Sequence, residues 1–571
     1  MRMTKNRVTA VLCAAGVGLF AASTVEAAKP SPKPNEIKVQ ILSFNDYHGH
    51  LQPPTGGDAT LGAVLDPTNT LVGGSEYLST TLTNLRANAR NSITATAGDL
   101  IGGSPFLSGL FHDEPSVESL EAMHLDVSSV GNHEFDEGLT ELLRMQNGGC
   151  HPVDGCYFPA QPYDGANFPW LAANVVHADT GATVLPPTWT KTVEGVKIGF
   201  IGMTLEDTPV LVAQSGIIGL EFQDEVIAAN LAAADLMAQR VKSIVVLLHE
   251  GGAQTGTYNG CDGISGPIVE IAENLAPSID LVVTGHTHLP YICDIPDPLG
   301  APRMVTSASS FGRVVTETWL TINSRSGEVK RAHTTSTNHL VTRTEADPAL
   351  TAIISKWNTI SAPIANRVVG SISGDLVRSP NRDTESTMAN TIADAQLEAT
   401  AGSPANAQIA LQNPGGVRAD LTVAQISGGE QPGEVTYGEA FQVQPFGNLL
   451  VTMTLTGAQV EAALEQQYVV GRPGGRDQLI LGVSRGLTFS FSTTLPAGDR
   501  ISNVQLNGVP LDPAANYQVT VNNFLADGGD AFTVFREGTN RIGGGEDLVA
   551  LTNYLGAHSP VAPPADRITG I

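Results

Sequence analysis

The seven residues from Val130 to Asp136 (VGNHEFD) place an amide oxygen, an imidazole and a carboxylate within one short turn. An apolar run, 125–130, precedes the turn, and a helix-like segment, 137–145, follows it. An amide oxygen can ligate a metal, and an imidazole backed by a carboxylate can act as an acid or a base. Asn132, His133 and Asp136 are therefore candidates for such chemistry, if other segments bring similar groups to the same place.

Other apolar, strand-like runs also end in Asp or His, often beside glycine. Helix-like segments separate these runs, and this alternation predicts an α/β layered domain whose site lies at the carboxyl ends of the strands. Asp46 and His48 are two residues apart, so they point the same way in an extended chain. The strand-like runs and the polar groups after them are 37–44 with Asp46 and His48, 92–97 with Asp99, 243–248 with His249, and 279–284 with His286 and His288.

The donors at these strand ends outnumber the ligands of one divalent ion. Seven nitrogen and oxygen donors suit two ions that share one bridging carboxylate. Any single histidine is more typically a core or surface residue, but five strand ends with the same residue types favour a common site. His133 and Asp136 are not assigned as metal ligands. The seven candidate ligands are Asp46, His48, Asp99, Asn132, His249, His286 and His288.

The N-terminus predicts a secretory signal peptide, residues 1–27. A basic start precedes an apolar core, 8–22, which is too short to span a bilayer comfortably, and Val25-Glu26-Ala27 fits a cleavage site. Cleavage after Ala28 and a retained N-terminal anchor are the alternatives. We expect an exported protein, periplasmic or extracellular. The last residues, 561–571, carry no hydrophobic tail, so neither a GPI signal nor a membrane anchor is expected there.

The chain is acidic, with a formal net charge of −26 over 571 residues. Cleavage after Ala27 would remove Arg2, Lys5, Arg7 and Glu26, leaving 28 basic and 56 acidic residues, about −28. This balance argues against a nucleic acid polymer as a partner, which requires a basic footprint. An anionic small substrate would need a locally positive site made by metals or clustered arginines. The length favours two large domains.

Four cysteines remain after the predicted signal peptide. An even number in an exported protein suggests two disulfides, and no CxxC spacing points to zinc. Cys150–Cys156 would close a short loop and leave Cys261–Cys293 as the second pair, although other pairings stay open.

The second half begins after a helical pattern, 348–365, which we interpret as a helix that links two domains. A hinge and a rigid connection are both compatible with it. A helix-like run, 386–400, precedes strand-rich sequence, which predicts a smaller α+β domain. Arg378 and Arg382 could hold a phosphate or be solvated surface residues. Phe446 and Phe524 could stack on a nucleobase or pack in the core.

The ordered segments DYHGH at 46–50, GD at 98–99, GNHEFD at 131–136, His249, and GHTH at 285–288 resemble the signature of calcineurin-like metallophosphoesterases. With its second half, the chain resembles the secreted 5′-nucleotidase/UDP-sugar hydrolase family over nearly its whole mature length. The resemblance implies that residues 36–340 form a four-layer αββα metallophosphoesterase domain. It also implies a linker helix in 341–367 and a 5′-nucleotidase C-terminal nucleotide-binding domain in 368–571.

The resemblance further implies two divalent ions, Zn, Mn, Co or Mg, bridged by Asp99. His133 and Asp136 match the family's catalytic dyad, whereas Glu134 and His50 are expected to lie outside the site. At position 288 better-known relatives carry Gln or Asn, which leaves the metal preference open. The implied ligands are Asp46, His48, Asp99 and His288 for one ion, and Asp99, Asn132, His249 and His286 for the other.

The implied substrate site lies in the second half. Residues 413–418 (NPGGVR) resemble the family's NGGGIR loop, with Pro414 in place of a glycine, which stiffens the loop. Phe446 and Phe524 match the base-stacking positions. The full implied set is Arg378, Arg382 and Arg418 for the phosphate, Asn413, Gly415 and Gly416 in the loop, Phe446 and Phe524 for the base, and Asp530 for the ribose.

These features predict a phosphohydrolase that converts a nucleoside 5′-monophosphate to a nucleoside and phosphate by metal-activated water attack with a His–Asp dyad. The alternatives at the same site are UDP-sugar pyrophosphatase and 2′,3′-cyclic nucleotide phosphodiesterase activity. A non-catalytic nucleoside-binding or metal-binding protein is the alternative from another class. We expect a monomer, although the sequence leaves the oligomeric state open.

Overall fold

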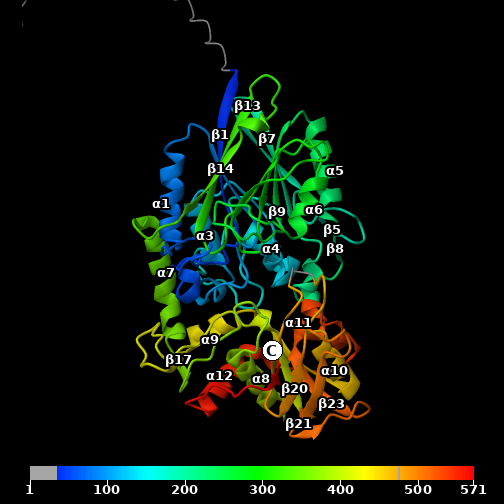
Figure 1. The fold of residues 1–571 in the computed structure, drawn as a ribbon. Helices are drawn as coiled ribbons and strands as arrows, with labels where there is room; N and C mark the ends of the chain where they lie inside the picture. Colours follow the sequence, from blue (N-terminus) through cyan, green and yellow to red (C-terminus); the bar gives the residue numbers. More distant parts are fainter. Residues whose placement is uncertain (1–34, 473–475, 571) are drawn as a thin grey trace, which may run out of the picture.

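The structure is a computed structural model that describes residues 35–472 and 476–570. The predicted signal peptide, 1–27, lies outside these residues. Within the described part of the chain, no helix has both the length and the apolar character needed to cross a membrane. The chain forms two halves, one above the other in Figure 1, with the N-terminal half in blue to green and the C-terminal half mainly in yellow to red.

Two six-stranded sheets form the centre of the N-terminal half. Parallel pairing of β1 with β2 and of β2 with β3 aligns their carboxyl ends in the first sheet, as does the parallel pairing of β9 with β10 in the second. The first sheet has the order β14 (Thr335–Leu340), β13 (Val314–Asn323), β1 (Glu36–Phe44), β2 (Ser92–Ala97), β3 (Val127–Ser129) and β4 (Trp170–Leu171). The second has the order β11 (Tyr291–Asp294), β12 (Met304–Ser307), β10 (Leu281–Thr284), β9 (Ser243–His249), β7 (Val196–Thr204) and β6 (Thr188–Val193).

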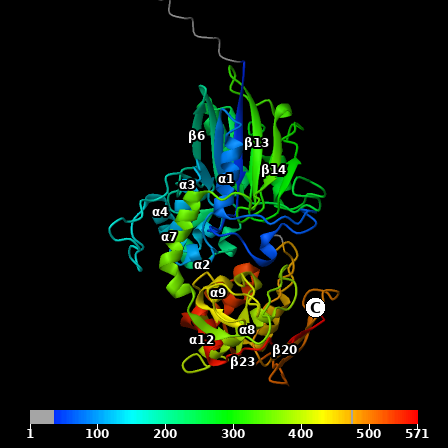
Figure 2. The same cartoon turned by 90° about the vertical axis from the view of Figure 1, so that its left-hand side faces the viewer.

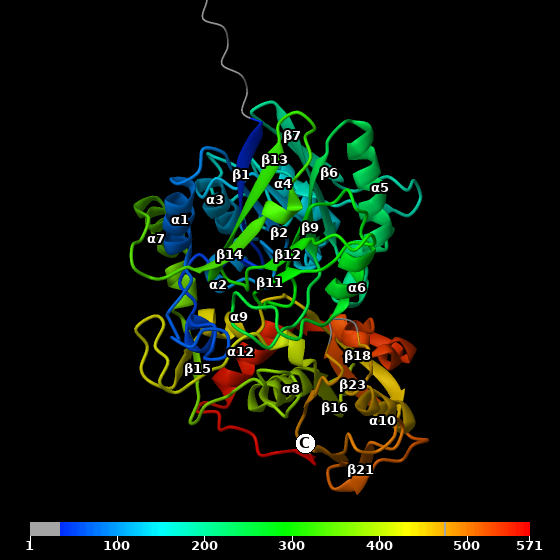
Figure 3. The same cartoon turned by 45° about the horizontal axis from the view of Figure 1, so that its top comes forward.

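The two sheets pack face to face because their strands are apolar on both faces. In β1, Ile41 packs between the sheets with Val245 of β9, whereas the next residue, Leu42, faces the helices. Val246, the neighbour of Val245, packs in turn beneath the helices of the second sheet. Figure 3 shows the helices on the two outer sides. They are α1 (Ser75–Arg86), α3 (Glu114–Ala122) and α4 (Gly138–Asn147) over the first sheet, and α5 (Glu225–Ala238) and α6 (Pro267–Asn274) over the second. The predicted αββα layering is confirmed.

Helix α7 (Pro348–Ala365) lies along one edge of both halves (Figure 2). Asp347 caps its first turn by accepting a hydrogen bond from the backbone N–H of Ala349. The helix contacts α1, α3 and the short α2 (Phe106–Gly109) in the N-terminal half and α9 (Tyr437–Val443) in the C-terminal half. The predicted helix at 348–365 is confirmed, whereas the domain boundaries around it stay predictions.

The C-terminal half mixes sheets and helices, as the α+β prediction requires. Its main sheet packs against α8 (Thr387–Thr400), α10 (Gly457–Glu465) and the short α11 (Asn523–Ala526), and α12 (Asp547–Ala557) packs on α8. The main sheet has the order β19 (Gly482–Val483), β16 (Ile409–Gln412), β23 (Asn516–Asn522), β18 (Leu449–Thr456) and β24 (Thr539–Glu546). A smaller sheet has the order β22 (Val509–Pro510), β21 (Ile501–Leu506), β20 (Leu487–Phe491) and β25 (Ile568–Thr569).

Two pairs of short strands complete the arrangement. Strand β15 (Val368–Ser371) pairs with β17 (Glu434–Thr436), and β5 (Val175–His177) pairs with β8 (Leu220–Phe222). Both predicted disulfides, Cys150–Cys156 and Cys261–Cys293, are present.

Candidate active site

The carboxyl ends of five strands meet at the edge of the N-terminal half that faces the C-terminal half. The donors after β1, β2 and β3 are Asp46, His48, Asp99 and Asn132, and those at the ends of β9 and β10 are His249, His286 and His288. Asp46, His48, Asp99, His286 and His288 all have positive φ, between 47° and 69°. This left-handed backbone is uncommon outside glycine and is typical of functional sites. All seven predicted metal ligands come together here.

Asp46, His48 and His288 form the first group of donors. The Nε2 atom of His288 lies 3.2 Å from Asp46 Oδ1 and 3.3 Å from His48 Nε2. His48 Nδ1 lies 2.8 Å from the carbonyl oxygen of Gly102, to which it donates, so Nε2 carries the lone pair. A lone pair that faces a second imidazole nitrogen and a carboxylate fits a bound cation.

Asp99, Asn132, His249 and His286 form the second group. His249 Nδ1 donates to the carbonyl oxygen of Ala97 at 2.7 Å, so Nε2 carries the lone pair and lies 3.0 Å from Asp99 Oδ2. This buried Nε2 has no hydrogen-bond partner of correct geometry among the described residues. His286 Nδ1 lies 3.1 Å from Asn132 Oδ1. The donors of this second group therefore fit a divalent metal. Asp99 faces the first group as well, because its Oδ2 atom lies 3.5 Å from His48 Nε2.

His133 and Asp136 form the predicted pair beside these donors. His133 Nδ1 lies 2.8 Å from Asp136 Oδ2, and the His133 backbone N–H donates to Asp99 Oδ1 at 2.9 Å. Burial lowers the pKa of His133, but the charges of Asp136 and Asp99 outweigh burial and raise it above its usual value. Because Nδ1 is engaged with Asp136, Nε2 is the nitrogen left for a reacting group.

Glu134, which the sequence analysis placed outside the site, holds the loops that carry the donors. Its buried carboxylate accepts hydrogen bonds from the backbone N–H groups of Asp99 at 2.9 Å, Leu100 at 2.8 Å and Gly131. Burial raises its pKa to about 7. Glu134 is not one of the donors, but it positions two of the loops that bear them. The sequence does carry a signal for this role: Glu134 lies within a turn of candidate site residues that glycine borders.

Two side chains of the C-terminal half reach the His133–Asp136 pair. The Phe446 ring lies nearly parallel to the His133 ring, with centroids 5.9 Å apart, and the Arg418 guanidinium carbon lies 5.7 Å from the Phe446 centroid. The three side chains surround Gly103, where a Cβ atom would stand 3.4 to 3.6 Å from each of them. Phe446, Arg418 and His133 therefore meet across the two halves.

The three predicted phosphate-binding arginines differ in their contacts. Arg378 donates to the carbonyl oxygen of Arg418 at 2.6 Å and to Asp58 Oδ2 at 3.1 Å. The guanidinium groups of Arg382 and Arg418, by contrast, have no hydrogen-bond or ion-pair partner in the described part of the chain. Burial lowers the pKa of Arg382 to about 9, with Arg476 and Arg418 adding to the decrease. Two partly buried cations are thus available for an anion.

The predicted loop 413–418 lies beside Arg382 and Asp530. Asn413 Nδ2 donates to Asp530 Oδ2 at 3.1 Å, and a Cβ atom at Gly415 would stand 3.3 Å from both Arg382 and Asp530. A Cβ atom at Gly416 would stand 2.5 Å from Gln412 Nε2 and 2.9 Å from Asn413 Oδ1, so a larger residue there would have to displace these side chains. The structure brings Asn413, Gly415, Arg382 and Asp530 together.

Phe524 and Phe446 make separate contacts. Phe446 stacks on His133, whereas Phe524 is half-buried against the core of the C-terminal half and lies against Gly529, where a Cβ atom would stand 2.5 Å from its ring. The sandwich of a base between the two rings stays a prediction.

Sequence reasoning missed two arginines that shape this region. Buried Arg313 donates to the carbonyl oxygens of Asp58 and Thr60 and so holds the loop that presents Asp58 to Arg378. Arg472 donates to the carbonyl oxygen of Asp530. Neither arginine lies in a segment with a recognisable motif.

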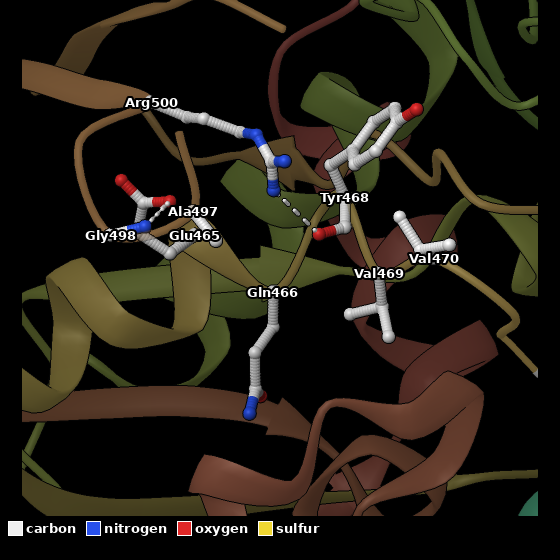
Figure 4. A pocket seen from close by; sticks show the side chains of 8 residues that line it. All are labelled: Glu465, Gln466, Tyr468, Val469, Val470, Ala497, Gly498 and Arg500. Carbon is white, nitrogen blue, oxygen red and sulfur yellow. Dashed lines mark hydrogen bonds between the residues drawn. The ribbon is translucent and has the colours of Figure 1, made fainter. Parts of the chain in front are cut away.

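A hollow of about 400 Å³ lies elsewhere, in the C-terminal half (Figure 4). Its charged side chains are bound to backbone groups: Arg500 donates to the carbonyl oxygen of Tyr468, and Glu465 accepts from the N–H of Gly498. None of the predicted site residues lines it. Its lining is Glu465, Gln466, Tyr468, Val469, Val470, Ala497, Gly498 and Arg500.

Comparison with known proteins agrees with this fold. The family model described as "5'-nucleotidase, C-terminal domain" matches residues 368–537. An endonuclease of Bacillus subtilis is 31% identical over 94% of this chain, and a cell wall protein of Listeria monocytogenes is 32% identical over 96% of it. The chain spans 42% of the length of the Bacillus protein and 71% of that of the Listeria protein.

A solved structure shows the same arrangement over both halves. The 5′-nucleotidase precursor of Thermus thermophilus superimposes with a TM-score of 0.74 at 28% identity, covering 93% of this chain and 99% of that one. The fold and the site together define a two-domain phosphoesterase with a calcineurin-like N-terminal domain. The chain belongs to the 5′-nucleotidase family, whose members are phosphoester hydrolases that act on nucleotides.

Proposed function

We propose that this protein removes the 5′-phosphate from nucleoside 5′-monophosphates, releasing a nucleoside and inorganic phosphate. The observation that carries the proposal is the meeting of Phe446 and Arg418 of one half with His133 of the other, around Gly103. The Phe446 ring suits a nucleobase, the Arg418 guanidinium suits a phosphate, and the His133 imidazole suits a leaving alkoxide. All three lie beside the cluster of metal-binding donors.

Asp46, His48, Asp99 and His288 would hold one divalent ion, and Asp99, Asn132, His249 and His286 a second. When bound, such ions supply an activated water and neutralise charge on the phosphate. The 3.0 Å approach of His249 Nε2 to Asp99 and the 3.2 Å approach of His288 Nε2 to Asp46 support this assignment. Zn, Mn, Co and Mg remain the candidate metals, and His288 favours an ion that accepts imidazole.

His133 would hold a proton at Nε2 for the leaving alkoxide, and Asp136 would fix the ring through Nδ1. Arg382 and Arg418 would bind the phosphate oxygens, because charge-assisted hydrogen bonds from guanidinium groups are short and strong. Arg378 would also bind the phosphate, in competition with Asp58, to which its guanidinium donates at 3.1 Å. Phe446 would stack on the base, with Phe524 as its counterpart, and Asn413 with Asp530 would face the ribose.

The test is a substrate panel with purified, tag-free protein and Mn²⁺. We expect phosphate release from AMP, reduced about 10²- to 10⁴-fold in His133→Ala, as is typical for loss of a general acid. UDP-glucose, 2′,3′-cyclic AMP and single-stranded DNA are the competing substrates. DNA is included because the Bacillus relative is described as an endonuclease. Faster cleavage of any of the three would replace the proposed substrate, and no turnover above His133→Ala would favour a binding protein.

We also propose export after cleavage behind Ala27, which rests on the basic and apolar pattern of residues 1–27. N-terminal sequencing of the protein recovered outside the cytoplasm should begin at Ala28. A first residue of Met1 or Arg2 would contradict the proposal.

A further inference from the structure

A second cluster of histidines and carboxylates lies outside the candidate active site. His112 follows α2, Glu137 precedes the first residue of α4, and His151 and Asp154 belong to the loop that Cys150–Cys156 closes. Three chain segments thus converge on it. One ligand atom from each of His112, His151 and Asp154 lies within 4.8 Å of the others.

The two imidazole rings of this cluster are stacked, with centroids 3.7 Å apart and planes 17° apart. His112 Nε2 lies 2.9 Å and His151 Nδ1 lies 3.7 Å from Asp154 Oδ2. On the opposite edge of the rings, Glu137 Oε2 lies 2.8 Å from His112 Nδ1 and 3.9 Å from His151 Nε2. Each carboxylate therefore faces one nitrogen of each ring.

The cluster favours positive charge between its two carboxylates. Both nitrogens of His112 face carboxylate oxygens at hydrogen-bond distance, but a neutral imidazole carries only one N–H. Arg144 does not supply the charge, because it is bound to Glu114 and Glu141. Burial lowers the pKa of His112, but Glu137 and Asp154 outweigh burial and raise it to about 9. Without another cation, a second proton on His112 fills this role.

We propose that His112 Nε2, His151 Nδ1 and Asp154 bind one divalent transition-metal ion of the zinc class, with Glu137 as the group that orients His112. Two imidazoles and a carboxylate are zinc ligands, and a water would complete the tetrahedron. A ligating histidine ordinarily donates its other N–H to a carboxylate, which is the relation of His112 Nδ1 to Glu137 at 2.8 Å.

Binding would require side chains of this cluster to rearrange. The side chains of His112 and His151 are 16% and 12% exposed, whereas Glu137 and Asp154 are 45% and 55% exposed, so an ion can enter from the acidic side. The rings must turn about χ2, a broad torsion, to converge on one ion. The ion displaces the proton at His112 Nε2 and the hydrogen bond that the Asp154 N–H donates to His151 Nδ1.

The ion would join the disulfide-closed loop to the segment beneath α7. Phe111, next to His112, lies 4.8 Å from the Trp357 ring of α7 and 5.0 Å from the Tyr157 ring just beyond the loop, centroid to centroid. The site would therefore be a structural one, beside the segment that packs on Trp357 in the middle of α7.

The experiment compares zinc content in tag-free, full-length mature protein after chelation, equilibration with Zn²⁺ and desalting. His112→Ala/His151→Ala should hold one zinc per chain fewer than the unmodified protein. The matched control, His124→Ala/His558→Ala, changes two surface histidines outside the cluster and should hold the same number as the unmodified protein. Because the result is a difference, it does not depend on how many ions the strand-end donors hold, nor on AMP turnover.

Two single variants guard against misfolding of the double variant. Asp154→Asn and Glu137→Gln alter exposed side chains and should each weaken the affinity for this zinc, Glu137→Gln by about 10- to 100-fold. With Co²⁺, the absorption difference between the unmodified protein and the double variant should be that of a tetrahedral site. Equal zinc content in the unmodified protein and the double variant, or unchanged affinity in both single variants, would overturn the proposal.

Discussion

The guanidinium of Arg378 donates a hydrogen bond to Asp58 Oδ2 at 3.1 Å, so an arginine of the C-terminal half is bound to a carboxylate of the N-terminal half. Arg313 holds the Asp58 loop through backbone carbonyls, and Arg378 also donates to the carbonyl oxygen of Arg418. Asp58 therefore pairs with Arg378, an arginine that the family resemblance assigns to phosphate binding.

Asp58→Asn should lower the KM for AMP because the carboxylate no longer competes with phosphate for Arg378. The pair is partly exposed, and such pairs contribute about 0–1 kcal/mol, so we expect a two- to fivefold decrease with kcat nearly unchanged. Steady-state kinetics check this, with Asp262→Asn as a surface control. A higher KM would mean that Asp58 supports substrate binding.

Asp99→Ala should remove two metal ions and the activity together, because Asp99 faces both groups of donors. Metal analysis of the variant should find two ions fewer per chain than in the unmodified protein. Asp179→Ala, at an exposed position, is the control. Retention of both ions would contradict the bridging role.

Glu134→Gln should destabilise the protein and weaken metal binding. The carboxylate accepts three backbone N–H groups, and an amide in its place directs an N–H donor at them. A buried polar group left without its partner costs about 1–3 kcal/mol. Thermal unfolding and metal titration measure the effect against Glu345→Gln. An unchanged melting temperature with unchanged metal affinity would refute the positioning role.

Asp136→Asn should shift the alkaline limb of the kcat–pH profile for AMP to lower pH. Burial lowers the pKa of His133, and Asp136 is the largest influence that raises it. The protonated His133 donates the proton, so activity falls as pH rises through this pKa, and loss of the Asp136 charge lowers the pKa. An alkaline limb at the same pH in both proteins, with the same metal, would show that it reports another group.

Phe446→Ala should raise the KM for AMP but leave the KM for p-nitrophenyl phosphate nearly unchanged. Base stacking contributes about 1–3 kcal/mol per base, roughly 5- to 150-fold in KM. Phe524→Ala should show the same selectivity together with a lower melting temperature, because its ring also packs on the core. Equal losses on both substrates would mean that the rings serve only packing.

Local pattern was sufficient for the elements that carry the donors. The apolar run 92–97 is β2, the run 37–44 is all but the first residue of β1, and the helical pattern 348–365 is α7. Strand and helix periods are local properties of the chain. The parallel order of β1, β2 and β3 then places Asp46, Asp99 and Asn132 at one edge.

The sequence by itself determined the types and the order of the donors, the His133–Asp136 spacing and the even number of cysteines after the predicted signal peptide. Only the tertiary structure decided that Glu134 holds the Asp99 loop, that Asp58 binds Arg378, and that His112 stacks on His151. These relations join residues from separate segments, and the packing of the sheets and the two halves, rather than any local period, sets the distances between them.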